Sequence, residues 1–305
     1  MEALNRFLSF VEVKTKLASV VPFFTGLAYA LYVNKRIDPA GTLVFFAAML
    51  LFDMTATAIN NHIDARRAGG GSKAHYSNPA SLALILSMLV LSAALGLVLT
   101  AMHGLVVLAA GVICFVTGIL YTFGPVPVSK TPYGEALSGF VMGFFITFIA
   151  VYVNLPKDAL ISLPSVFPDI VIDIKLAAMV KLGLVAVPLM CGIANIMLAN
   201  NICDLESDIK TARHTLPHYI GIRRSLALFA ALYYIGFGVI LALSAFRVIP
   251  YTCILGLAGL IPVRKNIAGF YARQVKSETF NLSVINFMLL SVPYFILIFI
   301  GCLFF

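Results

Sequence analysis

The sequence contains few charged residues for its length. Only 11% of its 305 residues are Asp, Glu, Lys or Arg, and 61% are hydrophobic, whereas a soluble domain carries roughly 25% charged residues. This composition excludes an ordinary soluble globule. Because no segment outside the hydrophobic runs is long enough to form a soluble domain, we expect residues 1–305 to form a single membrane domain.

Cysteine is also scarce. The five cysteines are scattered singly, mostly within hydrophobic runs, and lack the paired spacing of a metal knuckle or a disulfide framework. Residues 1–16 carry charges of both signs and no cleavage site made of small residues, so they do not predict a removable signal peptide. The hydrophobic runs lack the alternation of an outer-membrane barrel, which makes helices the expected spanning elements.

Nine hydrophobic runs are each expected to cross the membrane as a helix, for which ~20 residues are needed. They predict an all-α, multi-pass protein of the cell membrane. The predicted spans are residues 17–33, 40–64, 80–102, 104–123, 134–154, 176–199, 225–246, 248–263 and 282–305. Residues 155–172, between the fifth and sixth spans, are Pro-rich and nearly neutral, which is typical of a plain connector.

The distribution of positive charge predicts the orientation of the chain. There are 21 Lys and Arg residues against 13 Asp and Glu. Fifteen of the 21 precede the first span or lie in the even-numbered loops, and five lie in the odd-numbered loops. Since Lys and Arg are enriched in cytoplasmic loops, we expect the N-terminus and the even-numbered loops to be cytoplasmic.

A polar pattern recurs at the ends of the second and sixth spans. Asn60-Asn61-His62-Ile63-Asp64 and Asn200-Asn201-Ile202-Cys203-Asp204 share the form NNxxD and are expected at the same membrane face. On a helix, Asp53, Thr57, Asn60 and Asp64 form one stripe, and Asn200, Asn201, Asp204 and Asp208 form another. The repeat predicts two related halves, about residues 1–130 and 131–270, followed by a final helix.

The two stripes predict a cation site. Carboxylates gathered around one cavity repel one another unless a cation lies between them, and Asp and Asn oxygens suit Mg²⁺. Such a metal would bridge the protein to a diphosphate. The expected ligands are Asn60, Asp64, Asn200, Asp204 and Asp208, and Asn61 and Asn201 could assist directly or through a ligand. Nearby cations that could neutralise the phosphate charge are Arg66, Arg67, Lys73, Lys210 and Arg213.

These motifs resemble the UbiA superfamily of intramembrane prenyltransferases over nearly the whole chain. The resemblance rests on Asn60-x-x-x-Asp64 and Asp204-x-x-x-Asp208 at the ends of the second and sixth of nine spans. Three further segments look like the branch that prenylates 1,4-dihydroxy-2-naphthoate in menaquinone synthesis: Val13-Lys14-Thr15, Tyr121 to Pro125 with Thr131 to Glu135, and Asn201 to Asp208 running into Thr215-Leu216-Pro217.

The resemblance implies a helical bundle around a central cavity that is open sideways to lipid. It implies Mg²⁺-dependent transfer of a polyprenyl group from polyprenyl diphosphate to an aromatic acceptor, with Asp64, Asp204 and Asp208 as the catalytic aspartates. The first motif departs from the family, because Ala68 and three glycines stand where another aspartate usually follows. The first metal would therefore be held by fewer charges.

Several other polar residues have two interpretations each. Lys14 could contact the diphosphate or the acceptor carboxylate, or be a positive anchor at the membrane face. Tyr121 and Lys130 could close over the site or pack within their loop. Glu135 could cap its helix or line the mouth of the site, and Lys181 could extend outward or pair with an acid. Asp53, near mid-membrane, should face a partner or a polar cavity. The loop histidines His62, His75, His214 and His218 are expected to be solvated.

Other functions are conceivable for such a chain. A specialised enzyme could prenylate another aromatic or quinone precursor. A phosphatidyl transferase also uses Mg²⁺ and Asp-rich helix ends, but its compact Asp-Gly, Ala-Arg motif is absent here. A transporter could line its pathway with the polar stripes, although transporters usually bind substrate near mid-membrane. No feature indicates a nucleic-acid partner.

Overall fold

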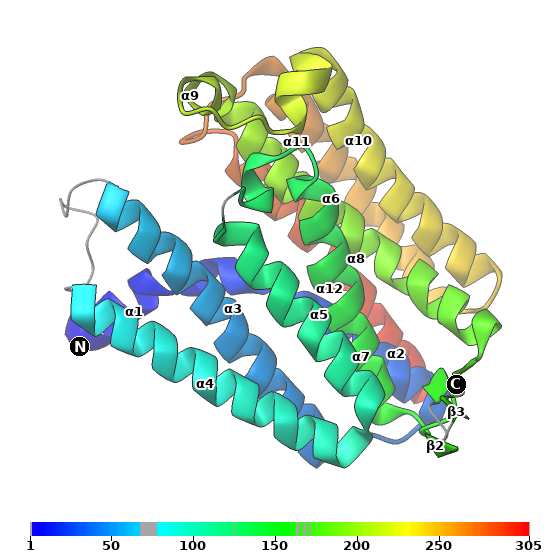
Figure 1. Cartoon of the computed structure of the whole chain (residues 1–305). Coiled ribbons are helices and arrows are strands. Elements are labelled where there is room, and N and C mark those ends of the chain that lie inside the picture. Colours follow the sequence, from blue (N-terminus) through cyan, green and yellow to red (C-terminus); the bar gives the residue numbers. More distant parts are fainter. Residues whose placement is uncertain are drawn as a thin grey trace. The chain divides into compact units, whose positions relative to one another are not determined.

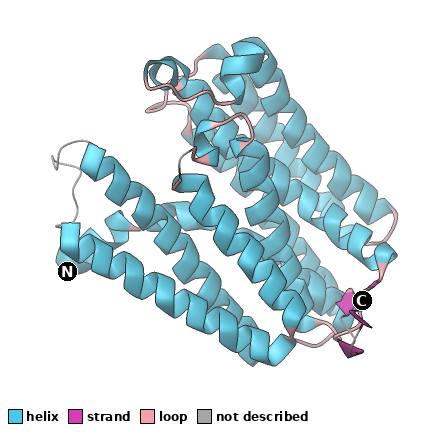
Figure 2. Ribbon diagram, in the orientation of Figure 1, coloured by secondary structure: helices cyan, strands magenta, loops and turns pink. Residues whose placement is uncertain are grey.

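The computed structural model describes residues 2–67, 78–124, 126–162, 165–166, 169–170 and 172–304. This part of the chain is almost entirely helical (Figure 2). The helices are α1 (Glu2–Phe10), η1 (Val13–Lys16), α2 (Leu17–Asn34), α3 (Pro39–Arg67), α4 (Asn78–His103), α5 (Leu105–Thr122), η2 (Val128–Lys130), α6 (Gly134–Ser138), η3 (Gly139–Phe145), α7 (Ile146–Asn154), α8 (Leu176–Cys203), α9 (Leu205–Lys210), α10 (Leu216–Ala245), η4 (Tyr251–Gly259), α11 (Leu260–Ala272) and α12 (Asn281–Phe304). Figure 1 labels most of them.

Within the described residues, nine helical stretches are long and apolar enough to cross a membrane, which confirms the all-α, nine-span prediction. The sixth span continues to Cys203 rather than ending at residue 199, so both asparagines of its motif remain helical. The seventh begins at Leu216 but breaks at Gly221, whose φ of 77° is left-handed. The eighth extends to Ala272, because Pro262 falls in the first turn of α11, where proline is tolerated.

The connector after the fifth span contains short strands rather than plain coil. Strand β1 (Ile161–Ser162) pairs antiparallel with β4 (Asp173–Ile174), and β2 (Ser165–Val166) pairs antiparallel with β3 (Asp169–Ile170). Each strand has two residues, too few for a hydropathy pattern to reveal.

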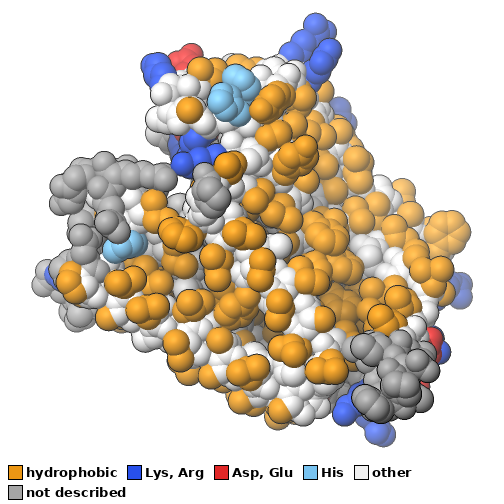
Figure 3. Space-filling view, viewed as in Figure 1, with side chains coloured by type: hydrophobic (Ala, Val, Ile, Leu, Met, Phe, Trp, Pro, Cys, Tyr) orange, Lys and Arg blue, Asp and Glu red, His pale blue; other side chains and the backbone are white. Residues whose placement is uncertain are grey.

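The surfaces of the helices are apolar. Large hydrophobic side chains are exposed along α4, among them Leu82, Leu86, Val90 and Leu97. In Figure 3 the visible flanks of the helices are mostly hydrophobic, and the Lys, Arg, Asp and Glu side chains in view lie near helix ends. A contiguous apolar surface of this kind fits lipid, in agreement with a multi-pass membrane protein.

The described chain divides into two compact units. Unit 1 comprises residues 1–20 and 38–127, and its helices α3 and α4 pack along each other. The end of α1 packs onto this pair, because Phe10 and Val11 join Ala58, Ile85 and Met88 in one buried cluster. The N-terminal segment is therefore held against the half of α3 that carries the first polar motif.

Unit 2 comprises residues 21–37 and 128–305, and α8 packs against α6, η3, α10 and α12 within it. Glycines allow the fifth span to approach α8 closely. A Cβ on Gly143 would lie 2.7 Å from the Cα of Met190, and one on Gly139 would lie 2.6 Å from the Met190 carbonyl oxygen. Small residues at such a contact let the backbones of two helices approach closely. The fifth span thereby presents its first residues to the end of α8.

Candidate functional site

The second aspartate motif lies at a break between two helices. Helix α8 ends at Cys203, Asp204 has φ −93° and ψ 1°, and α9 begins at Leu205. The break is bridged by a bond from the Asp208 amide to the Asp204 carbonyl oxygen at 2.8 Å. The motif thus spans a short bend and not the continuous helix that the stripe assumed. Within α9, Glu206 is exposed and Asp208 is buried.

Asp208 is the most buried acid of the motif, with 3% of its surface exposed. Its Oδ1 lies 3.3 Å from the Nε of Arg213. Burial raises the pKa of this carboxyl, and the charge of Arg213 opposes that rise. The Thr215 hydroxyl also favours the charged form, but neither it nor Asp208 Oδ2 makes a hydrogen bond of normal geometry within the described chain. Asp208 therefore keeps one buried acceptor oxygen available.

Asp204 is more accessible and pairs with a residue that sequence reasoning missed. Its side chain is 21% exposed, and its Oδ2 forms an ion pair with Nζ of Lys276 from the segment between α11 and α12. The Ser207 hydroxyl donates to the Asp204 carbonyl oxygen at 2.8 Å. Each aspartate of the second motif therefore faces one cation, Lys276 or Arg213.

A third carboxylate lies beside this motif. Glu135, at the start of α6, is 4% exposed and accepts a hydrogen bond from Nδ2 of Asn201 at 2.8 Å through Oε1. Its Oε2 has no hydrogen-bond partner among the described residues. The negative charges of Glu135 and Asp208 repel each other. Asn201, 1% exposed, therefore links the acid of the fifth span to the motif of the sixth, and its role toward a metal or substrate stays a prediction.

The loop that carries Lys130 contacts the segment that follows α9. The backbone amide of His214 donates to the Lys130 carbonyl oxygen at 3.0 Å, and a guanidinium nitrogen of Arg213 lies 3.5 Å from the Ser129 carbonyl oxygen. Lys130 is thus held beside the second motif by its backbone. Lys210, in the last turn of α9, is exposed, and Asn200 is half-buried with its amide 3.4 Å from Asn201 Oδ1.

The first motif is described in part. Asn60 is exposed on α3, and Asn61 donates from Nδ2 to the Phe10 carbonyl oxygen at 2.9 Å. His62 was expected in a solvated loop, but it lies on α3 with its Nδ1 2.7 Å from the Ser81 hydroxyl. The side chains of Lys14, Asp64, Arg66 and Arg67 lie outside the described part, as do Lys73 and His75 altogether. The convergence of Asp64 with the second motif stays a prediction.

Tyr121 and Lys181 can be placed individually. Tyr121 is half-buried in the last turn of α5, in unit 1. Lys181 is exposed on α8, which favours an ammonium that extends outward over one that pairs inside the bundle.

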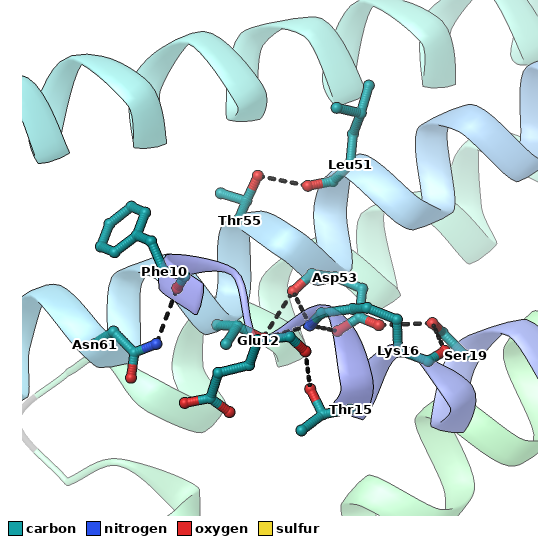
Figure 4. A network of polar contacts seen from close by, with 10 residues as sticks. Phe10, Glu12, Thr15, Lys16, Ser19, Leu51, Asp53, Thr55 and Asn61 are labelled. Atoms are coloured by element: carbon teal, nitrogen blue, oxygen red, sulfur yellow. Dashed lines mark hydrogen bonds and ion pairs between the residues drawn. The ribbon is translucent and has the colours of Figure 1, made fainter. Parts of the chain in front are cut away.

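Asp53, whose partner the sequence left open, belongs to a closed network in unit 1 (Figure 4). Its Oδ1 accepts from Nζ of Lys16 at 2.8 Å, and its Oδ2 accepts from the Ser19 hydroxyl at 2.6 Å. Lys16, 4% exposed, also donates to the Asp53 carbonyl oxygen and to the Thr57 hydroxyl. The three donors of the ammonium thus have three acceptors.

The second motif has the chemistry of a divalent-cation site. Among the described residues no group of three or more His, Cys, Asp and Glu side chains is close enough to hold a metal alone. Asp204 and Asp208 nevertheless provide hard oxygen ligands, and the buried Oδ2 of Asp208 lacks the partner that a buried acceptor normally has. This donor set fits Mg²⁺, which commonly takes one or two carboxylates and leaves its other positions to water and phosphate.

Comparison with known proteins gives consistent matches. The sequence pattern of the UbiA prenyltransferase family matches residues 19–292. The 1,4-dihydroxy-2-naphthoate octaprenyltransferase of Bacillus subtilis is 27% identical over an alignment of 227 residues, which covers 71% of this chain and 66% of that protein. The chain thus spans about two thirds of the length of this relative.

Solved structures share the fold. A digeranylgeranylglyceryl phosphate synthase has a TM-score of 0.66 at 15% identity, with full coverage of both chains. A UbiA homologue from Archaeoglobus fulgidus bound to GPP and Mg²⁺ has a TM-score of 0.65 at 14% identity, covering 97% of this chain and 99% of that chain. A homologue from Aeropyrum pernix K1 has a TM-score of 0.64 at 17% identity, covering 90% and 97%.

Proposed function

Because this chain belongs to the UbiA prenyltransferase family, we propose that it transfers a polyprenyl group from a polyprenyl diphosphate to an aromatic acceptor. The proposed acceptor is 1,4-dihydroxy-2-naphthoate, in the synthesis of menaquinone. The family match over residues 19–292 carries this proposal, and the Bacillus subtilis relative supports the choice of acceptor. The buried, unpartnered oxygen of Asp208 supports it independently, since a prenyl diphosphate site needs a cation.

The residues that would hold Mg²⁺ are Asp204 and Asp208 from the second motif, with Asn60 and Asp64 from the first. When bound, the cation would neutralise the diphosphate that leaves the allylic carbon. The Mg²⁺ and GPP bound by the Archaeoglobus fulgidus homologue are in line with this assignment. Asn200 and Asn201 stay candidate ligands, of which Asn201 is already engaged with Glu135.

Cationic side chains of this chain would neutralise the remaining negative charge of the diphosphate. Arg213 pairs with Asp208, Lys210 lies in the last turn of α9, and the loop of Lys130 is bonded to His214, so cationic residues are available beside the second motif. They would stabilise the departing diphosphate through charge-assisted hydrogen bonds. The apolar helices would exclude water, which would otherwise capture the allylic cation.

With the naphthoate as acceptor, the proposed reaction breaks an allylic carbon–oxygen bond and a ring carbon–carboxylate bond, and it forms one carbon–carbon bond. The allylic carbon–oxygen bond breaks, and the electron pair leaves with the diphosphate. A ring carbon of the acceptor then bonds to the allylic carbon. In the naphthoate the carboxylate at that position leaves as CO₂, and its electron pair restores the ring. Lys14, Arg66, Arg67, Lys73 and Tyr121 stay candidate substrate contacts.

The proposal is tested with purified protein in detergent or lipid nanodiscs. The protein is incubated with a polyprenyl diphosphate and 1,4-dihydroxy-2-naphthoate, with Mg²⁺ or with EDTA, and products are identified by mass spectrometry. We expect a prenylated, decarboxylated naphthalenediol that forms only with Mg²⁺. Parallel reactions with other aromatic acids test a different acceptor. Absence of a prenylated product with every acceptor would refute the proposed function.

A further inference from the structure

The segment between α11 and α12 contains a compact turn that carries Lys276 to the second aspartate motif. The amides of Glu278 and Thr279 both donate to the Val275 carbonyl oxygen, at 3.0 and 2.8 Å, and the Val275 amide donates to the Thr279 hydroxyl at 3.0 Å. Arg273 pairs with Glu278 at 2.6 Å within the same turn. The local bonds fix the backbone on both sides of Lys276, while its side chain extends to Asp204, 72 residues away in sequence.

The two cations of the motif hold their aspartates differently. Arg213 approaches Oδ1 of Asp208 through Nε, and Oδ2 makes no hydrogen bond of normal geometry among the described residues. Lys276 instead engages Oδ2 of Asp204 directly, and its side chain is 53% exposed. An ammonium on a long, half-exposed side chain can move away at little cost, since such pairs are weak in water.

A lysine ammonium and a divalent cation compete for Oδ2 of Asp204, because both are attracted to the same carboxylate oxygen and their positive charges repel each other at short range. Binding of a cation to this oxygen would therefore weaken the ion pair and release Lys276. Once released, its side chain remains attached to the adjacent turn, where an anion that arrives with the cation would lie within its reach.

We propose that Lys276 exchanges partners during binding: it neutralises Asp204 until a divalent cation arrives and then contacts the diphosphate that the cation carries. The inference rests on the proposed function for the identity of the anion. Lys276 is thereby a competitor of the free cation and a ligand of the cation-bound diphosphate. This exchange would disfavour a cation without its diphosphate and favour the pair.

Two binding measurements test the exchange on the full-length protein in detergent. The first follows free Mn²⁺ by electron paramagnetic resonance without any diphosphate. Lys276→Met should bind Mn²⁺ about threefold more tightly than the wild type, because the competing ammonium is gone. The second measures inorganic pyrophosphate by calorimetry at saturating Mg²⁺. The same variant should bind pyrophosphate several-fold more weakly, because the anion has lost a contact.

Two matched variants accompany these measurements. Arg273→Met removes a cation from the same turn that pairs with Glu278 and not with Asp204, so it should leave both affinities near those of the wild type. Lys276→Arg keeps the charge and should restore both. Thermal unfolding of every variant establishes that it is folded.

The exchange is refuted if Lys276→Met leaves Mn²⁺ affinity unchanged or lowers it, if pyrophosphate affinity does not fall, or if Arg273→Met has the same effects. Neither measurement uses prenyl transfer. Expected binding shifts in a protein that forms no prenylated product would preserve the role of Lys276 and overturn the proposed function. A functional prenyltransferase without those shifts would overturn only the role of Lys276.

Discussion

The two polar clusters of this protein differ in how completely their atoms are paired. In unit 1, Lys16, Ser19, Asp53 and Thr57 form a closed network in which the ammonium has three acceptors and both carboxylate oxygens have donors. In unit 2, the buried Asp208 and Glu135 each keep one oxygen without a hydrogen bond among the described residues. Both clusters contain acids that are largely shielded from solvent, so acid content alone does not distinguish them.

This difference in pairing predicts which cluster contributes to stability and which is available to bind a ligand. A buried ion pair whose donors and acceptors are all matched has nothing left to offer a ligand, and breaking it leaves an uncompensated charge. A buried carboxylate with an unmatched oxygen has lost water without gaining a partner, and a cation can supply that partner. We therefore expect variants of the closed network to change stability and variants of the open cluster to change activity.

The largest effect is expected for Asp208→Asn. The substitution preserves size but removes the charge that would hold the cation, so prenyl transfer should fall by ~1,000-fold. The thermal unfolding midpoint should not fall, because the buried acid has no complete set of partners to lose. Glu206→Gln, an exposed acid of the same helix α9, is the matched control and should keep near-normal activity. An active Asp208→Asn enzyme would contradict the metal assignment.

Lys16→Met should have the largest effect on stability. It leaves the half-buried Asp53 without its buried counter-ion. Breaking a fully buried pair costs about 3–5 kcal/mol, so the loss here should lie near the lower end of that range. The double variant Lys16→Met/Asp53→Leu should recover much of this loss, because both charges are then absent. Chemical or thermal unfolding in a defined detergent measures both. If the double variant is no more stable than Lys16→Met, the pair does not explain the loss.

Asn61→Ala distinguishes two roles for the second asparagine of the first motif. As seen here, Asn61 ties α3 to the end of α1, so its loss should cost about 1 kcal/mol of stability. Prenyl transfer by the folded variant should stay within about twofold of the wild type. A collapse of activity in a stable variant would instead identify Asn61 as a metal ligand.

The smallest effect is expected for the way the stability of the protein without bound metal depends on pH. The pKa of Asp208 is raised by burial above its ordinary value, so the folded state binds a proton more tightly than the unfolded state. Asp208 therefore contributes stability at a pH below its pKa in the unfolded state. This contribution is lost as the pH rises through its higher pKa in the folded state. In EDTA, Asp208→Asn should be more stable than the wild type at neutral pH, with the difference vanishing in acid. An unfolding midpoint difference that does not vary with pH would contradict this assignment.

Much of the architecture could be predicted from the sequence. Each membrane span can be recognised from the hydropathy of its own residues. The nine spans could therefore be predicted without knowing which helices pack beside them. The second aspartate motif could also be found in the sequence, because Asp204 and Asp208 lie only four residues apart along the chain. Span boundaries were less accurate where Gly221 breaks a helix and where α11 continues past Pro262.

The partners of the site residues could not be predicted in this way. Lys276 is 72 residues from Asp204, Glu135 is 66 from Asn201, and Lys16 is 37 from Asp53. No periodic pattern connects residues so far apart. Lys16 was counted among the positive charges at the cytoplasmic face, and only its burial beside Asp53 shows that it is a counter-ion.

The amino-acid sequence by itself determined where the chain enters and leaves the membrane and which acids stand at the ends of two spans. Transfer of apolar side chains out of water acts residue by residue and needs no particular neighbour. The tertiary structure alone decided which buried acids are neutralised and which keep an oxygen for a ligand. Hydrogen bonds and ion pairs act over a few ångströms, so they depend on the packing of α8, α6 and the turn at Lys276, and not on the order of residues along the chain.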